Sequence, residues 1–447
     1  MHFGTPARLL RSDFVALVGL LLGLLGAGCA SYPDRTEGAL HAFSRGHFQE
    51  AARKFADDGI TDSAFLSGAE AGTAALVAGD WQAALEHLHR AADEVRDLER
   101  RALIGTDSLS EELGTWVFND TARTYRGEGF ERVYLHAGLA LAYLALGYEE
   151  DSRVEIRRSN ALLESEEKLY EKEYEAGGLG HFLSAVLYEL EGLPDEAYID
   201  YGRMEEKGVG TRIAGRALVR LANQMGWQDD ARLWEERYGP DFERPLGAAS
   251  IVVIGGLGLG PFKSGGTIPI PTSDGIVPIS AAVYERRPQQ VTALRLRLTG
   301  SDVAVRTDLI EDVFAVAAEN LEDRLLWMAA KSIARGLLKR ELTKKLEDEW
   351  DDGGRFLGDV FAFFSERPDL RCWQTLPDNW QACRVFVVPG VHDIVLEALG
   401  GERIALGAFE LDEGETMVIL ARTLQGRLYA HALGGEPVGA EEAAAAP

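Results

Sequence analysis

The sequence is poor in the residues that build metal sites and nucleophilic catalytic sites. Its 447 residues include only three cysteines and nine histidines. The cysteines lack the spacing of a zinc site, and no two histidines have the His-x-x-x-His spacing with a nearby carboxylate. No serine lies in a Gly-x-Ser-x-Gly turn. These absences favour a protein with no metal, no other cofactor and no enzymatic activity.

Basic residues are also scarce. The chain has 46 lysines and arginines against 72 aspartates and glutamates, so its net charge is -26. Such a surface repels nucleic acids and anionic lipids. We therefore expect no nucleic-acid partner, and we expect any membrane attachment to come from a covalent lipid and not from basic patches.

No hydrophobic run is long enough to span a bilayer. The apolar stretch that begins at Phe14 has about 15 residues, whereas a spanning helix needs roughly 20. Arg8 and Arg11 precede this stretch, and small residues follow it up to Cys29. A basic start, an apolar core and small residues before the cut are typical of an export signal, here residues 1–28. The ending resembles the bacterial lipobox, although an ordinary signal peptide with an incidental cysteine is the alternative.

The lipobox interpretation predicts where the mature protein resides. Cys29 would be lipidated and become the first residue of the mature chain, with residues 29–33 as a lipidated N-terminus and linker. Ala30 stands where an aspartate would favour retention in the inner membrane. We therefore expect an outer-membrane lipoprotein that faces the periplasm.

Residues 34–240 contain few prolines and much Ala, Leu, Glu and Arg, which predicts an almost continuous series of helices. A motif recurs there: a glycine, an alanine five residues later and usually a large apolar residue nine residues later. The motif glycines are Gly46, Gly79, Gly192 and Gly226, with a weaker copy at Gly147. Spacings near 34 residues are typical of helix-turn-helix repeats.

The motif has a physical interpretation. Each glycine would end the first helix of a pair in left-handed backbone, and the alanine would let the second helix approach closely. The large residue would fill the layer between them. The pattern resembles the second half of the tetratricopeptide repeat and predicts an α-solenoid, with a generic helical bundle as the alternative.

The composition changes near Pro240, where Gly, Pro, Val, Ile and Thr become frequent. Residues 246–433 are predicted to form a β-rich, sandwich-like domain, since short strands recur between turn residues. We expect strands near residues 250–254, 267–270, 277–280, 291–298, 383–388, 392–396, 403–409, 416–421 and 427–431.

A long helix is predicted to interrupt these strands over about 307–350. Asp308 and Glu311 have the spacing of a capping box at its start. The Ala-, Glu- and Gly-rich end, residues 434–447, is predicted to be disordered. The fold class is therefore α+β in two domains, a helical solenoid followed by a β-sandwich-like domain with a helical insertion.

The glycine-rich residues 255–264 superficially match a phosphate-binding loop, because a strand precedes them and Lys263 lies near their end. Pro261 and Phe262 break the required spacing, and no helix follows. We expect a connection between strands and no nucleotide.

Cys372 and Cys383 are the two cysteines of the mature chain besides Cys29. The periplasm is oxidising, so an even pair suggests a disulfide. The alternative is two buried free thiols, since reach depends on geometry.

One segment breaks the helical repeats and carries several charged and aromatic residues. It contains Tyr125, Glu128, Phe130, Glu131 and Arg132. We predict that these residues form an interaction site, in which the charged ones pair with a partner or brace the break in the repeats.

Three parts of the chain together resemble a family of uncharacterised bacterial lipoproteins with tetratricopeptide-like N-terminal halves. They are residues 119–132 with 154–158, residues 258–263 with Pro278, and residues 369–377 with 382–384 and 389–390. Genes of this family often lie near that of a lipoprotein activator of penicillin-binding proteins. The resemblance implies a role in cell-envelope or peptidoglycan assembly, and it supplies no catalytic residues.

The sequence thus predicts a lipid-anchored periplasmic adaptor or scaffold that binds a protein or peptide of the envelope. The alternatives are a glycan-acting enzyme of the envelope, which would need two carboxylates in a cleft, and a structural subunit of an outer-membrane complex.

Overall fold

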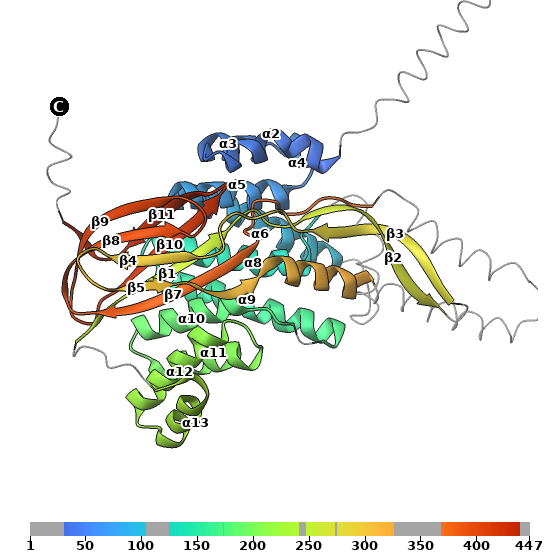
Figure 1. The fold of residues 1–447 in the computed structure, drawn as a ribbon. Helices are drawn as coiled ribbons and strands as arrows, with labels where there is room; N and C mark the ends of the chain where they lie inside the picture. Colours follow the sequence, from blue (N-terminus) through green and yellow to red (C-terminus); the bar gives the residue numbers. More distant parts are fainter. Residues whose placement is uncertain are drawn as a thin grey trace, which may run out of the picture.

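The computed structural model describes residues 31–103, 125–172, 174–240, 247–272, 275–325 and 368–438. Helices fill the first half of the chain and sheets most of the second, so the predicted α+β class is confirmed (Figure 1). The predicted signal peptide, Cys29, and residues 439–447 of the predicted tail lie outside the described residues.

The helices follow one another as antiparallel pairs, and each pair packs on the next along the chain. They are α2 (Tyr32–Ser44), α3 (Phe48–Phe55), α4 (Asp58–Thr61), α5 (Ala64–Ala78), α6 (Trp81–Leu103), α8 (Gly129–Ala145), α9 (Glu149–Tyr170), α10 (Gly178–Leu190), α11 (Pro194–Glu206), α12 (Thr211–Met225) and α13 (Gln228–Tyr238). Because α2 begins at Tyr32, the helical region starts slightly before the predicted residue 34.

The motif glycines have the predicted conformation. Gly46, Gly79, Gly147, Gly192 and Gly226 all have φ between 73° and 85°. Each lies between the two helices of a pair. The residue after each glycine donates its backbone N–H to a carbonyl five residues earlier, as in the 2.9 Å bond from His47 N to Ala42 O. This bond closes a Schellman motif, which only a left-handed residue permits at low cost.

The small and large motif residues are also buried as predicted. The small positions are Ala51, Ala84, Ser152, Ala197 and Ala231, and the buried large positions are Phe55, Leu88, Ile156 and Tyr201. The fifth large position is Glu235, which is half-buried. The motif therefore marks the contact between the two helices of each pair.

The first sheet has β1 at its centre, in the order β11-β10-β1-β7-β6. Its strands are β1 (Ala249–Leu257), β6 (Asp308–Asp312), β7 (Asn379–Val387), β10 (Thr416–Leu424) and β11 (Arg427–Leu433). Strand β1 runs parallel to β10 and antiparallel to β7. It is buried along its whole length, which explains its unbroken apolar sequence.

The second sheet covers the outer face of the first. Its order is β12-β9-β8-β4-β5, with β4 (Leu294–Leu298), β5 (Ala304–Arg306), β8 (Gly390–Ala398), β9 (Arg403–Leu411) and β12 (Glu436–Pro437). Alternate residues of β1 serve two cores. Ile251 and Val253 belong to the cluster between the sheets, whereas Val252 and Ile254 belong to the cluster shared with the helices. The molecule therefore has three layers: helices, first sheet and second sheet.

A separate hairpin extends away from the sheets (Figure 1). It consists of β2 (Phe262–Thr272) and β3 (Gly275–Glu285), which pair with each other in a two-stranded antiparallel sheet. The predicted short strands at 267–270 and 277–280 are the outer part of this longer hairpin. Pro269 lies opposite Pro278 in the register, as edge strands tolerate.

Two predicted boundaries were wrong. Residues 308–312 form strand β6, and the helix begins at residue 313 and is described as far as residue 325. Asp312, and not Asp308, caps this helix by accepting the backbone N–H of Ala315 at 3.0 Å. Strand β12 also falls within the predicted tail, where Glu436 pairs with Glu410 of β9. In both places pairing with a strand that is distant in the sequence determines the structure. Local propensity does not predict such pairing.

Candidate functional site

The predicted interaction residues lie inside the protein at the start of α8. Tyr125, Glu128, Phe130 and Glu131 are all buried, and Arg132 is partly exposed. Tyr125 Oη donates to Glu131 Oε2 at 2.6 Å, and the backbone N–H of Glu128 donates to the same oxygen at 2.9 Å. The prediction that these residues form a surface for an external partner is therefore corrected, because Tyr125, Glu128, Phe130 and Glu131 are buried and Tyr125 and Glu131 bond to each other. The alternative, that they brace the break in the repeats, agrees with this geometry.

Glu128 is the acidic centre of a buried ionic cluster. Its carboxylate pairs with Lys263 Nζ at 2.5 Å and with the guanidinium of Arg324. Burial alone would raise the pKa of Glu128, but these two cations outweigh burial and hold the pKa well below its usual range. The lysine that ends the glycine-rich segment thus has an internal carboxylate as its partner, and its ammonium also lies over the rings of Tyr125 and Tyr284.

Glu131 links this cluster to a distant stretch of chain. Its Oε1 accepts the backbone N–H of Trp373 at 2.7 Å. Burial is the main reason why the pKa of Glu131 is raised to about 7, since Lys263 only partly offsets it. Phe130 packs edge-on against Tyr134 and Tyr284, and Arg132 pairs with Glu166 at 2.9 Å.

Residues 369–377 lie against the helices in an irregular conformation, and we call them the docked segment. Glu70 of α5 accepts the backbone N–H groups of Gln374 and Thr375 at 2.7 and 2.9 Å, and the hydroxyl of Tyr32 at 2.8 Å. The side chain of Gln374 donates to Thr36 at 2.9 Å. Glu70 of α5 and Glu131 of α8 therefore both accept hydrogen bonds from the backbone of this segment, as they could from a bound peptide.

The docked segment coincides with residues 369–377 of the family resemblance. Trp373 is buried, and its indole N–H lies 3.1 Å from the hydroxyls of both Thr73 and Thr375. The face of the helices that carries Thr36, Glu70 and Thr73 is therefore covered by the protein's own chain.

The predicted disulfide is not formed. Cys372 and Cys383 are both free and buried. Cys372 belongs to the cluster between helices and first sheet, whereas Cys383 lies opposite Val253 of β1 in the cluster between the two sheets. The first sheet itself separates the two thiols. Burial raises the pKa of each to about 12, which makes both poor nucleophiles.

Two further carboxylates join the helices to the sheet. Glu311 of β6 accepts the backbone N–H groups of Gly177 and Leu179 at 2.7 and 3.0 Å, at the N-terminus of α10. Glu189 of α10 pairs with Arg220 of α12 and Arg384 of β7, each at 2.6 Å. Glu311 thus joins β6 to α10, and Glu189 joins α10 to both α12 and β7.

The ion pairs of Glu189 make the stability of the protein depend on pH. Burial would raise the pKa of Glu189, but Arg384 and Arg220 outweigh it and lower the pKa from 4.5 to about 2. As the pH falls, Glu189 is therefore protonated in the unfolded chain at a higher pH than in the folded protein. The stabilisation is fully present above pH 4.5 and is lost as the pH falls toward 2, a difference of about 3 kcal/mol.

The test compares the wild-type protein with the Glu189→Gln variant. The unfolding free energy of each is measured in urea at several pH values. We expect the difference in unfolding free energy between them to shrink by about 3 kcal/mol between about pH 5 and pH 2. A difference that stays constant across this range would contradict the assignment.

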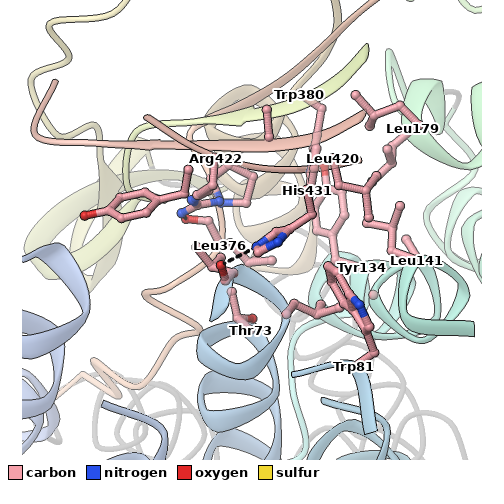
Figure 2. Close-up of a pocket in the computed structure, with 18 of the residues that line it drawn as sticks. Thr73, Trp81, Tyr134, Leu141, Leu179, Leu376, Trp380, Leu420, Arg422 and His431 are labelled. Atoms are coloured by element: carbon pink, nitrogen blue, oxygen red, sulfur yellow. Dashed lines mark hydrogen bonds between the residues drawn. The ribbon is translucent and has the colours of Figure 1, made fainter. Parts of the chain in front are cut away.

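An apolar cavity lies between α5, α8 and the first sheet (Figure 2). Its empty space is about 710 Å³, including the part that opens to solvent. Most of the lining is aliphatic or aromatic, with Trp81, Tyr134, Leu141 and Leu420 as examples. It includes one arginine, Arg422, and no lysine. The lining includes no aspartate or glutamate, so it does not hold the carboxylate pair that a glycan-acting enzyme uses.

The partners of several of these residues could not be predicted from the sequence. Glu70 had a local signal, because it is the sole charged residue of the otherwise small and apolar helix α5. Glu189, Lys263 and Arg422 had the same signal, since each is the only Asp, Glu, Lys or Arg of α10, β2 or β10, but that signal does not name the partner of each.

Comparison with protein-family models, with curated proteins and with solved structures finds no match. Within the described ranges, no group of three or more His, Cys, Asp or Glu side chains is placed to hold a metal ion. In the same ranges, no helix is both long enough and apolar enough to cross a membrane.

Proposed function

We propose that this protein is a lipid-anchored periplasmic adaptor or scaffold that binds a protein partner of cell-envelope or peptidoglycan assembly. The lipobox-like ending at Cys29 supports the anchor and the outer-membrane location. One structural observation carries the adaptor function: exposed apolar side chains recur at matching positions of the last two helical pairs.

These side chains, which together we call the apolar ridge, are Leu193, Ile199, Trp227 and Leu233. Their side chains are 38%, 55%, 41% and 57% exposed. Leu193 and Trp227 each follow a motif glycine, and Ile199 and Leu233 lie six residues further on. The same two positions of successive helical pairs are therefore apolar and open to solvent.

Tyr198 of α11 links the two helical pairs that carry the ridge. The rings of Tyr198 and Trp227 have centroids 5.1 Å apart, and Trp234 Nε1 donates to Tyr198 Oη at 2.7 Å. These helices lie at the end of the helical series, away from the sheets (Figure 1). Repeated exposed apolar positions at such an edge favour an interface.

The charge around the ridge describes the partner. Helix α11 has five carboxylates and one arginine, and α13 has four carboxylates and two arginines. An apolar ridge with acidic flanks is complementary to a segment that combines apolar side chains with Lys or Arg. We therefore assign the ridge to a protein segment of that composition.

This proposal includes a solenoid of degenerate tetratricopeptide-like pairs and a β-sandwich-like second domain. The left-handed glycines and buried alanines support the repeat. It also relocates the partner site: since the docked segment covers α2, α5 and α8, the partner would bind at α11 and α13 instead.

Photocrosslinking in cells tests the ridge. A photoreactive amino acid replaces Leu233 in the lipidated chain, and Val391 of β8, which is 56% exposed, is the control position. We expect a discrete adduct from position 233, with a partner that mass spectrometry identifies as an envelope-assembly protein, and a loss of at least about tenfold with Ile199→Asp.

Equal crosslinking from positions 233 and 391 would refute a specific ridge. An adduct that Ile199→Asp leaves unchanged would do the same. An adduct with an outer-membrane protein in fixed stoichiometry would favour the structural-subunit alternative.

A further inference from the structure

The cavity contains a buried cation that has no acidic partner. Arg422 of β10 is only 5% exposed. Its Nη2 donates to the carbonyl oxygens of Thr375 and Leu376, at 2.9 and 3.0 Å. Its Nε is buried and has no hydrogen-bond acceptor among the described residues. Part of the guanidinium is therefore satisfied by the docked segment, and part is left without an acceptor.

Several other cations in the interior of this protein have a carboxylate partner. Lys263 and Arg324 pair with Glu128, and Arg384 pairs with Glu189. Arg422 forms no ion pair with any described carboxylate, and burial lowers its pKa to about 9. A buried charge without a counter-charge is costly, so an anion that paired with Arg422 in this cavity would be stabilised.

The remainder of the cavity is suited to an apolar body. Figure 2 shows Arg422 and His431 on one side, with Leu141 and Leu179 on the other. The indole N–H of Trp380 is a second buried donor in the lining without an acceptor among the described residues.

We propose that this cavity binds a single-chain amphiphile that has one carboxylate head and an aliphatic tail, that is, a fatty-acid anion. The carboxylate would accept from Arg422 and the tail would lie among the leucines and tryptophans. One guanidinium balances one negative charge, and its planar fork matches a carboxylate. Nothing in the adaptor proposal requires this site, which uses a different part of the molecule.

The test is direct binding of dodecanoate to the Cys29→Ala variant, which lacks the lipid attachment site. Trp81, Trp373 and Trp380 line the cavity, so tryptophan fluorescence reports occupancy. Dodecanol and dodecyltrimethylammonium have the same tail with a neutral or cationic head. We expect dodecanoate to bind at least about tenfold more tightly than either.

A variant in the same background tests the role of the cation. We expect Arg422→Gln to weaken dodecanoate binding about tenfold or more and to leave dodecanol binding unchanged. Circular dichroism checks that this variant is folded, because Arg422 also holds the docked segment. If it is not folded, the comparison of head groups on the Cys29→Ala protein decides the matter alone.

Two results would overturn the proposal. One is equal affinity for dodecanoate and dodecanol, which would mean that the head group is not recognised. The other is the absence of any fluorescence change with dodecanoate at concentrations below its micelle formation.

Discussion

Replacing Glu70 by alanine is expected to destabilise the protein by about 4 kcal/mol. The side chain is fully buried and accepts from Tyr32, Gln374 and Thr375. Its loss leaves two backbone N–H groups and a hydroxyl without acceptors, and each such group costs about 1–3 kcal/mol. The cost falls on the contact between α5 and the docked segment, so both halves of the chain are affected.

Urea unfolding of the Cys29→Ala form, with and without Glu70→Ala, measures this effect. Glu86→Ala is the matched control, since Glu86 is an exposed glutamate on the neighbouring helix α6 and its replacement should cost under about 0.5 kcal/mol. Glu70→Gln should fall between the two, because its amide keeps one acceptor but turns a donor toward donors. A Glu70→Ala protein as stable as the control would show that the docked segment does not depend on this carboxylate.

Replacing Lys263 by methionine is expected to cost about 3–5 kcal/mol. Lys263 is buried, and its charge offsets those of Glu128 and Glu131. Burial would lower the pKa of Lys263, but these two carboxylates outweigh burial and raise it. Methionine keeps the volume of the side chain and removes the charge, which leaves Glu128 with Arg324 alone.

A double-mutant cycle with Glu128→Gln isolates the interaction. We expect the double variant to be less destabilised than the sum of the single variants, by about 2 kcal/mol. Thermal or urea unfolding of the four proteins measures the coupling. Additive effects would show that Lys263 acts through packing on Tyr125 and Tyr284 and not through the ion pair.

Much of the local structure was predictable from the sequence. The conformation of the motif glycines was predictable from the residue type, since left-handed backbone between two helices favours glycine. Strand β1 was equally predictable, because an apolar run such as residues 251–254 is typical of a buried strand. In both cases the residues that decide the structure are neighbours in the sequence.

The interior of the site was not predictable by the same means. Glu70 and Gln374 are 304 residues apart, and Arg324 and Glu128 are 196 residues apart. Charged residues with this spacing look like surface residues until the fold brings them together. The sequence singled out both residues 125–132 and residues 369–377, but it contained no sign that they contact each other.

The disulfide prediction failed for a related reason. Ten residues separate Cys372 from Cys383, which is short enough for a bridge, but a strand of the first sheet begins between them. Spacing along the chain does not say on which face of a sheet each side chain lies.

The docked segment has a consequence for the order in which the protein is made. Helix α5 emerges from the ribosome long before the residues that its buried carboxylate requires. At about 5–20 residues per second, the 304 residues between Glu70 and Gln374 take about 15–60 seconds to synthesise. Strands β10 and β11, which also pack on these first helices, appear later still. The first helices to be made are thus among the last parts of the protein to become stable, and the time of their completion is set by the far end of the chain.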